Sequence, residues 1–167
     1  MLILGIDPGT ASTGYGIIDR RGSKYIPVDY GLISTKAGMP QHERLEAIYL
    51  KVTELLKEYR PPVAAVEKLF FNRNVTNALM VGEARGVVLL ACALHGADVK
   101  EYTPLQVKMA LTGYGNADKK QVGEMVKTIL GLKKAPKPDD TADALAVAVC
   151  CAGNYAYDMI KKEAAND

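Results

Sequence analysis

The sequence predicts an α/β protein, in which a mixed sheet of five strands has helices packed on its faces. Two observations lead to this class. The chain begins with three strand-like segments whose connections are short enough for an antiparallel hairpin or meander. After them, helical segments alternate with short apolar strands, which is typical of βαβ units and parallel pairing. A hairpin followed by βαβ units gives a sheet of mixed direction.

Three strands are expected before the first helix, over residues 2–6, 15–18 and 24–34. The segment 9–14 between the first two is rich in Gly, Ser and Thr, like a loop that binds phosphate. It lacks the Gly-Lys-Ser/Thr ending of such a loop, and a strand rather than a helix follows it. We therefore interpret it as a hairpin turn.

The next segments predict a helix and a buried strand. Apolar residues between Leu45 and Tyr59 recur mostly three and four positions apart, as on one face of an amphipathic helix, and Pro61 and Pro62 end it. Residues 63–66 are all apolar, which favours a central strand covered on both faces.

A second helix is expected from about Asn74 to His95, and a fifth strand over 99–102. Residues 87–94 of this helix are apolar all round, which indicates burial in a core or an interface. Three further helices are expected, from Pro104 to the glycines at 113 and 115, from Lys119 to Leu130, and from Asp139 to about Gly153.

The 167 residues contain no internal repeat and no linker, so we expect a single domain, 1–167, in which 152–167 form a frayed tail. The first residues show no basic start, long apolar run or small-residue cleavage site, so we expect no signal peptide. The longest nearly apolar run, 86–94, is far shorter than the ~20 residues that cross a bilayer. These features predict a cytoplasmic protein with no membrane partner.

The net charge is only +2, but the charges are unevenly distributed. Residues 100–137 hold eight lysines and three acidic residues, whereas residues 138–167 hold six acidic residues and two lysines. The basic stretch is either a solvated helix face or a surface that contacts phosphates, next to a carboxylate cluster that needs a cation.

Four carboxylates are candidates for chemistry. Asp7 ends the first strand, Glu67 ends the fourth, and Asp140 and Asp143 open the last helix on one face. Each also has a structural interpretation, since Asp is common before Pro-Gly turns and at helix caps. If the first and fourth strands are neighbours, the four converge and need a cation, a shared proton or altered pKa values. Oxygen ligands select Mg²⁺ or Mn²⁺, and two such ions ~3.5–4 Å apart can promote phosphodiester hydrolysis.

Six segments carry a resemblance to a known family. They are residues 4–10 with Gly-Tyr-Gly at 14–16, residues 66–70, 82–87, the basic segments 106–108 and 117–122, and the closing Asp-x-x-Asp-Ala-Leu-Ala at 140–146. In this order they resemble the RuvC family of bacterial Holliday-junction resolvases. The resemblance runs from residue 2 to about 152, nearly the whole chain.

The resemblance implies an RNase H-like fold, with the first and fourth strands adjacent, and a homodimer with one metal-dependent site per subunit. It implies an endonuclease that resolves four-way (Holliday) DNA junctions by paired symmetric nicks in recombination and repair, leaving 3′-hydroxyl and 5′-phosphate ends. Asp7, Glu67, Asp140 and Asp143 match the family's catalytic acids, which would hold two Mg²⁺ ions per subunit, replaceable by Mn²⁺. Asp139 is an extra acid beside the motif, but the shared frame favours Asp140.

The resemblance also implies DNA contacts. Lys108 and Lys119 match DNA-contacting lysines of the family, and Lys120 is a further candidate for a phosphate contact. Phe70 matches an aromatic residue that stacks on a base, an interaction worth ~1–3 kcal/mol. The alternative is that Phe70 and Phe71 pack under a loop. The family further implies cooperation with the RuvA–RuvB branch-migration motor.

Three other functions stay open at this point. An ATPase of the actin and sugar-kinase type has a similar Gly-x-Asp-x-Gly-Thr loop, but it encloses its nucleotide between two lobes, and this length provides one. A non-catalytic junction-binding module would need only the lysines and Phe70. A related RNase H-like nuclease would act on RNA or on another branched DNA.

Overall fold

Five strands form one mixed sheet in the order β3-β2-β1-β4-β5 in the computed structural model, which describes residues 1–69 and 75–164. β1 (Leu2–Asp7) pairs antiparallel with β2 (Ser12–Arg21), which pairs antiparallel with β3 (Lys24–Ser34). β4 (Val63–Glu67) runs parallel to β1, and β5 (Asp98–Tyr102) runs parallel to β4. The first and fourth strands are therefore neighbours, as predicted.

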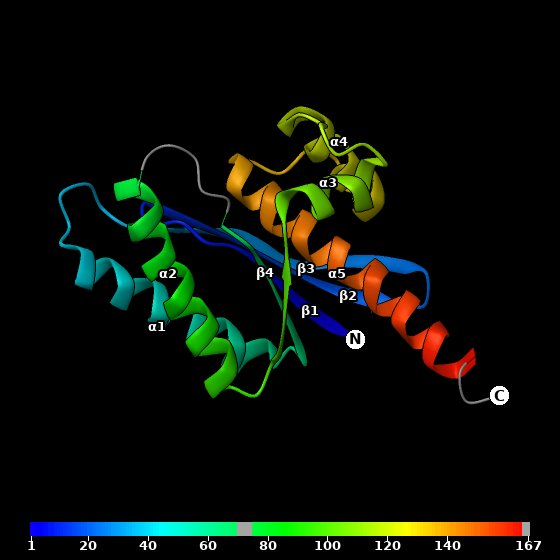
Figure 1. The fold of residues 1–167 in the computed structure, drawn as a ribbon, viewed down its shortest axis with the longest axis horizontal. Helices are drawn as coiled ribbons and strands as arrows, with labels where there is room; N and C mark the ends of the chain where they lie inside the picture. Colours follow the sequence, from blue (N-terminus) through cyan, green and yellow to red (C-terminus); the bar gives the residue numbers. More distant parts are fainter. Residues whose placement is uncertain (70–74, 165–167) are drawn as a thin grey trace.

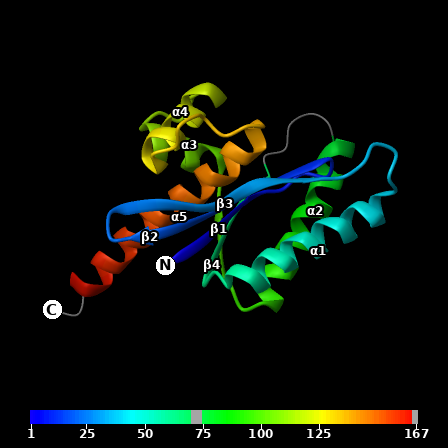
Figure 2. The ribbon, with the colours of Figure 1, turned by 180° about the vertical axis from the view of Figure 1, so that it is seen from behind.

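The described residues also form five helices, which are α1 (Gln41–Tyr59), α2 (Val75–Leu94), α3 (Pro104–Thr112), α4 (Lys119–Leu130) and α5 (Asp139–Ala164). Figures 1 and 2 show α1 and α2 side by side in one group and α3, α4 and α5 in another. The order of strands and helices and the mixed sheet confirm the predicted fold class.

Both faces of the sheet are covered because the central strands alternate between two cores. Ile3 of β1 and Val63 of β4 are buried with α3, α4 and α5, whereas the next residues, Leu4 and Ala64, are buried with α1 and α2. Successive side chains of a strand point to opposite faces. A central strand between two helical layers must therefore be apolar at every position, which explains the fully apolar run at 63–66.

Helix α5 lies directly on β1 and β2 because glycines leave room for it. A Cβ atom at Gly5 would collide with the backbone of Ala144, and one at Gly14 would collide with the backbone of Asp140. Gly14 is also the ladder partner of Asp7, the last residue of β1. The close approach therefore sets the first turn of α5 beside the end of β1.

The predicted bounds of β2 and of α5 are wrong. β2 spans Ser12–Arg21 instead of 15–18. Residues 12–14 of the expected turn are strand because they find ladder partners in β3 and at the end of β1, and residues 19–21 also pair with β3. α5 continues to Ala164 instead of ending near Gly153. A glycine inside a helix costs only about 1 kcal/mol, and most of the residues after it, which include Ala, Met, Lys and Glu, favour a helix.

Candidate active site

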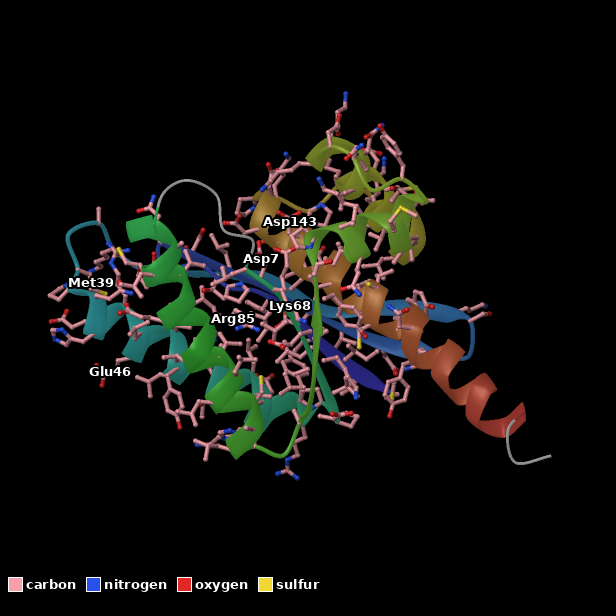
Figure 3. The ribbon with its side chains drawn as sticks, viewed as in Figure 1. Asp7, Met39, Glu46, Lys68, Arg85 and Asp143 are labelled. Atoms are coloured by element: carbon pink, nitrogen blue, oxygen red, sulfur yellow. The ribbon has the colours of Figure 1, made fainter. Side chains whose placement is uncertain are left out.

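Three carboxylates meet where β1 ends and α5 begins. Asp7 is the last residue of β1, and Asp140 and Asp143 lie in the first turns of α5, three positions apart on one face. One oxygen from each carboxylate lies within 4.8 Å of the other two. Figure 3 shows Asp7 and Asp143 close together at this junction of sheet and helix.

Glu67 joins the group from the neighbouring strand. β1 and β4 run parallel with Ile6 opposite Val66, so Asp7 and Glu67, which follow them, lie at the same edge of the sheet. The two carboxyl groups share a hydrogen bond, and both line a cavity that Asp143 also borders. The structure thus brings together all four acids that the sequence singled out.

The four acids hold more negative charge than their surroundings stabilise. Burial, followed by the charge of Glu67 and the other two carboxylates, raises the pKa of Asp7 far above its usual range. Burial is also the main cause that raises the pKa of Glu67 and the pKa of Asp143. Without a cation, these raised pKa values favour one proton shared between the carboxyl groups of Asp7 and Glu67.

The donor set suits a hard divalent ion. Each of the four groups offers carboxylate oxygens, which Mg²⁺ and Mn²⁺ prefer over nitrogen or sulfur ligands. An ion of charge +2 would take the place of the shared proton and offset the repulsion among the acids. The residues at this site therefore fit the kind of metal that the sequence predicts.

Asp140, and not the adjacent Asp139, belongs to the cluster. Asp139 faces Lys137, whose Nζ lies 2.9 Å from Oδ1, and this hydrogen bond and charge lower the pKa of Asp139. Asp140 instead accepts a hydrogen bond from the hydroxyl of Ser12. The geometry agrees with the motif frame that favours Asp140.

Two of the three candidate lysines line the same cavity as the acids. This cavity has a volume of about 360 Å³, and Lys108 of α3 and Lys119 of α4 border it together with Asp7, Glu67 and Asp143. Capping boxes fix where α3 and α4 begin. Nζ of Lys119 lies 3.1 Å from Oδ2 of Asp143. A phosphate in this cavity would meet positive charge beside the acids.

The third candidate lysine borders a different cavity. Lys120 borders an adjoining cavity of about 470 Å³, which Lys119, Lys137 and Asp143 also line. Phe70, the predicted stacking residue, lies outside the described residues, as does Phe71.

Asp7 and Asp140 also border a second cleft, which the sequence did not predict. The cleft has a volume of about 420 Å³ and lies between the loop 8–11, together with Ser12 of β2, and the α2 residues Asn77, Met80 and Val81. The hydroxyl of Thr13 braces this loop by donating to the carbonyl oxygen of Gly9 at 2.6 Å.

Ser12 is the site residue that the sequence analysis missed. Its hydroxyl holds the carboxylate of Asp140, which lies 128 positions away along the chain. No local pattern links the two residues. Only the packing of α5 on β2, together with the earlier start of β2, brings them into contact.

Comparisons with known proteins show which chains this one resembles. A family described as crossover junction endodeoxyribonuclease RuvC matches residues 3–151. The chain is 57% identical over 162 residues to the RuvC of Alkaliphilus metalliredigens, covering 97% of this chain and 99% of the relative. It is 59% identical over 150 residues to that of Desulfitobacterium hafniense, covering 90% and 91%.

A solved structure is similar as well. The Thermus thermophilus RuvC in complex with a Holliday junction substrate superposes with a TM-score of 0.85 at 42% identity, over 90% of this chain and 92% of the other.

Proposed function

Because this chain belongs to the RuvC family of crossover junction endodeoxyribonucleases, we propose that it resolves four-way (Holliday) DNA junctions by paired symmetric nicks during recombination and repair. The observation that carries the proposal is one cavity that combines Asp7, Glu67 and Asp143 with Lys108 and Lys119. Acids that can hold divalent ions and lysines that can hold a phosphate are the two requirements of phosphodiester hydrolysis.

The four acids would bind the divalent ions. Asp7, Glu67, Asp140 and Asp143 would hold Mg²⁺, replaceable by Mn²⁺, with two ions per subunit. Bound ions would activate water and stabilise the charge that develops on the 3′-oxygen leaving group, so that 3′-hydroxyl and 5′-phosphate ends result. 

The lysines would bind the DNA strand. Lys108 and Lys119 border the acids, so they would hold the oxygens of the phosphate that is cut. Lys120 and its adjoining cavity would hold a neighbouring phosphate of the same strand. Binding through such contacts should weaken steeply as the salt concentration rises.

Helix α2 supports the proposal that two copies act together. Leu79, Leu90 and Leu94 share one face and are 66%, 54% and 64% exposed. A second copy that covers this face would bury it and, by two-fold symmetry, present two sites to two strands of a junction.

A membrane is the other environment that such a helix could enter. Residues 77–94 are long and apolar enough to cross a bilayer by length and composition alone. However, the opposite face of α2, with Ala84, Val88 and Ala91, is fully buried against the core of the domain. A helix with one face committed to a core favours a protein partner over a lipid one.

Cooperation with the RuvA–RuvB branch-migration motor is proposed from family membership alone. A binding assay between this protein and a junction loaded with RuvA–RuvB would test it. Binding no tighter than to the bare junction would contradict it.

The decisive experiment is a synthetic four-way junction incubated with Mg²⁺ and read for symmetric nicks on opposite strands. Asp7→Asn should abolish the nicks and keep junction binding, because the lysines are untouched. Asp139→Asn, a matched loss of charge outside the cluster, should keep both. Full cleavage by the Asp7→Asn protein, or no cleavage by the wild type, would contradict the proposal.

A further inference from the structure

Lys119 occupies an unusual position between the acids and the surface on which DNA would lie. It borders the cavity that contains Asp7 and Glu67, and it also borders the adjoining cavity with Lys120 and Lys137. Its side chain is 62% exposed, so the ammonium group has room to move between the two.

The present partner of Lys119 is one of the clustered acids. Nζ of Lys119 lies 3.1 Å from Oδ2 of Asp143, a carboxylate that is only 22% exposed. Asp143 is also one of the three carboxylates whose oxygens lie within 4.8 Å of one another. Among the ion pairs of the described residues, this is the one that connects a lysine to the acidic cluster.

A divalent ion in the cluster would compete with this lysine. The ion and the ammonium group would share the oxygens of Asp143 and repel each other at a separation of a few Å. The ion carries twice the charge and contacts several carboxylates at once, whereas Lys119 makes one partly exposed ion pair. The ion would therefore displace Lys119 from Asp143 and leave its ammonium group free to bind a phosphate at the edge of the same cavity.

We propose that Lys119 exchanges partners: it neutralises Asp143 while the acids lack a divalent ion, and it turns to a DNA phosphate once the ion is bound. The exchange rests on the proposed function for the identity of its second partner. It makes ion binding and junction binding mutually reinforcing, because each ligand removes a competitor of the other. Lys119 is then a positioning residue, which is free to bind a phosphate only when a divalent ion is bound to the acids.

The first test needs no DNA. Mn²⁺ is titrated into the protein by calorimetry, for the wild type, for Lys119→Met and for Lys120→Met. Lys120 is the matched control, since its substitution removes the same charge one residue further along α4. Loss of a partly exposed ion pair should tighten Mn²⁺ binding about two- to fivefold in Lys119→Met relative to Lys120→Met. Equal Mn²⁺ affinities of the two variants would overturn the exchange.

The second test measures junction affinity with and without Ca²⁺ at constant ionic strength. Ca²⁺ binds oxygen ligands but with longer distances and looser geometry than Mg²⁺, which favours binding over cleavage. The factor by which Ca²⁺ strengthens junction binding should be about two- to fivefold smaller in Lys119→Met than in the wild type. In Lys120→Met this factor should match the wild type. An undiminished factor in Lys119→Met would overturn the exchange.

Lys119→Arg keeps the charge and can keep the ion pair, so it should behave as the wild type in both tests. Circular dichroism of each variant separates a folding defect from a change in binding. The proposed function fails independently of the exchange, because it is lost if the wild type does not nick a junction with Mg²⁺. The Mn²⁺ titration stands whether or not any DNA is cut.

Discussion

Because α5 packs closely on the sheet, Gly14→Ala should disturb this site strongly without substituting any of its acidic residues. Gly14 pairs with Asp7 in the ladder, and its missing side chain faces the backbone of α5 at Asp140 and Thr141. These are backbone atoms of a packed helix, so no change of rotamer can relieve the collision. The first turn of α5 must move away from the sheet.

The size of the effect follows from the geometry. Non-bonded atoms rest ~3.5 Å apart, so the collision needs a shift of α5 on the order of 1 Å. Overpacking of this kind costs typically about 1–3 kcal/mol of unfolding free energy. Metal ligands must be held within about 0.5 Å, so we expect Mn²⁺ affinity to fall about 10- to 100-fold.

Gly153→Ala is the matched control for this substitution. Gly153 also lies inside α5, and the nearest atom to an added Cβ atom there is the hydroxyl oxygen of Tyr25 at 3.9 Å, an ordinary contact. The same change should therefore stabilise the protein by about 0.5–1 kcal/mol through helix propensity and leave Mn²⁺ binding unaltered. Urea unfolding and calorimetric titration with Mn²⁺, both without DNA, measure the two quantities. A Gly14→Ala protein with unfolding free energy within about 0.5 kcal/mol of the wild type and unchanged Mn²⁺ affinity would refute the role assigned to this contact.

Ser12→Ala should weaken Mn²⁺ binding about tenfold, because it removes the hydroxyl that donates to Asp140. Ser12→Thr keeps a hydroxyl and should bind Mn²⁺ as the wild type does in the same titration. An equal loss of Mn²⁺ affinity in both variants would contradict this role of Ser12. Without divalent ions, Asp7→Asn should be more stable than the wild type by an amount that grows as pH rises from 3.8 to about 9, because folding raises the pKa of Asp7 across that window. Urea unfolding at several pH values measures this difference, and a constant difference would argue against the raised pKa. The proposed pairing through α2 predicts that the wild type is a dimer by light scattering and that Leu90→Glu is a monomer with an unchanged circular dichroism spectrum, since this side chain is 54% exposed in the single chain. A monomeric wild type would contradict the pairing, and a dimeric Leu90→Glu protein would place the interface elsewhere.

Most elements of the fold could be predicted from local pattern, because residues that end helices and strands can be recognised in the sequence. The strand 24–34 and the helix 119–130 have the predicted bounds, and Gly131 ends that helix in the left-handed conformation with φ of 63°. Pairing could not be predicted in the same way. The start of β2 at Ser12 depends on partners in two other strands, so its small polar residues resembled a turn.

The four acids could be predicted for a different reason. A charged residue directly after a buried apolar strand, as at Asp7 and Glu67, lowers the stability of the fold unless its charge is paired or binds a ligand. Such a residue can therefore be recognised in the sequence as a candidate for a site. The supporting contacts have no such signature. The hydroxyl of Ser12 and the space left at Gly14 matter only because α5 lies on β2, and that packing emerges from the whole fold.

The starts of α4 and α5 explain how the site divides its charges. α5 opens with acids, which the positive end of a helix dipole stabilises, but α4 opens with Lys119 and Lys120, which the same dipole disfavours by ~0.3–1 kcal/mol each. Helix stability would favour acids at both positions, so the two lysines indicate a requirement other than folding. The carboxylate of Asp118 caps α4 by accepting from the backbone amide of Gln121, and an incoming phosphate would add a second negative charge beside the two lysines. The proposed polarity of the site, with ions on the side of α5 and DNA on the side of α4, would follow from these two helix starts, which meet at the ion pair of Lys119 and Asp143.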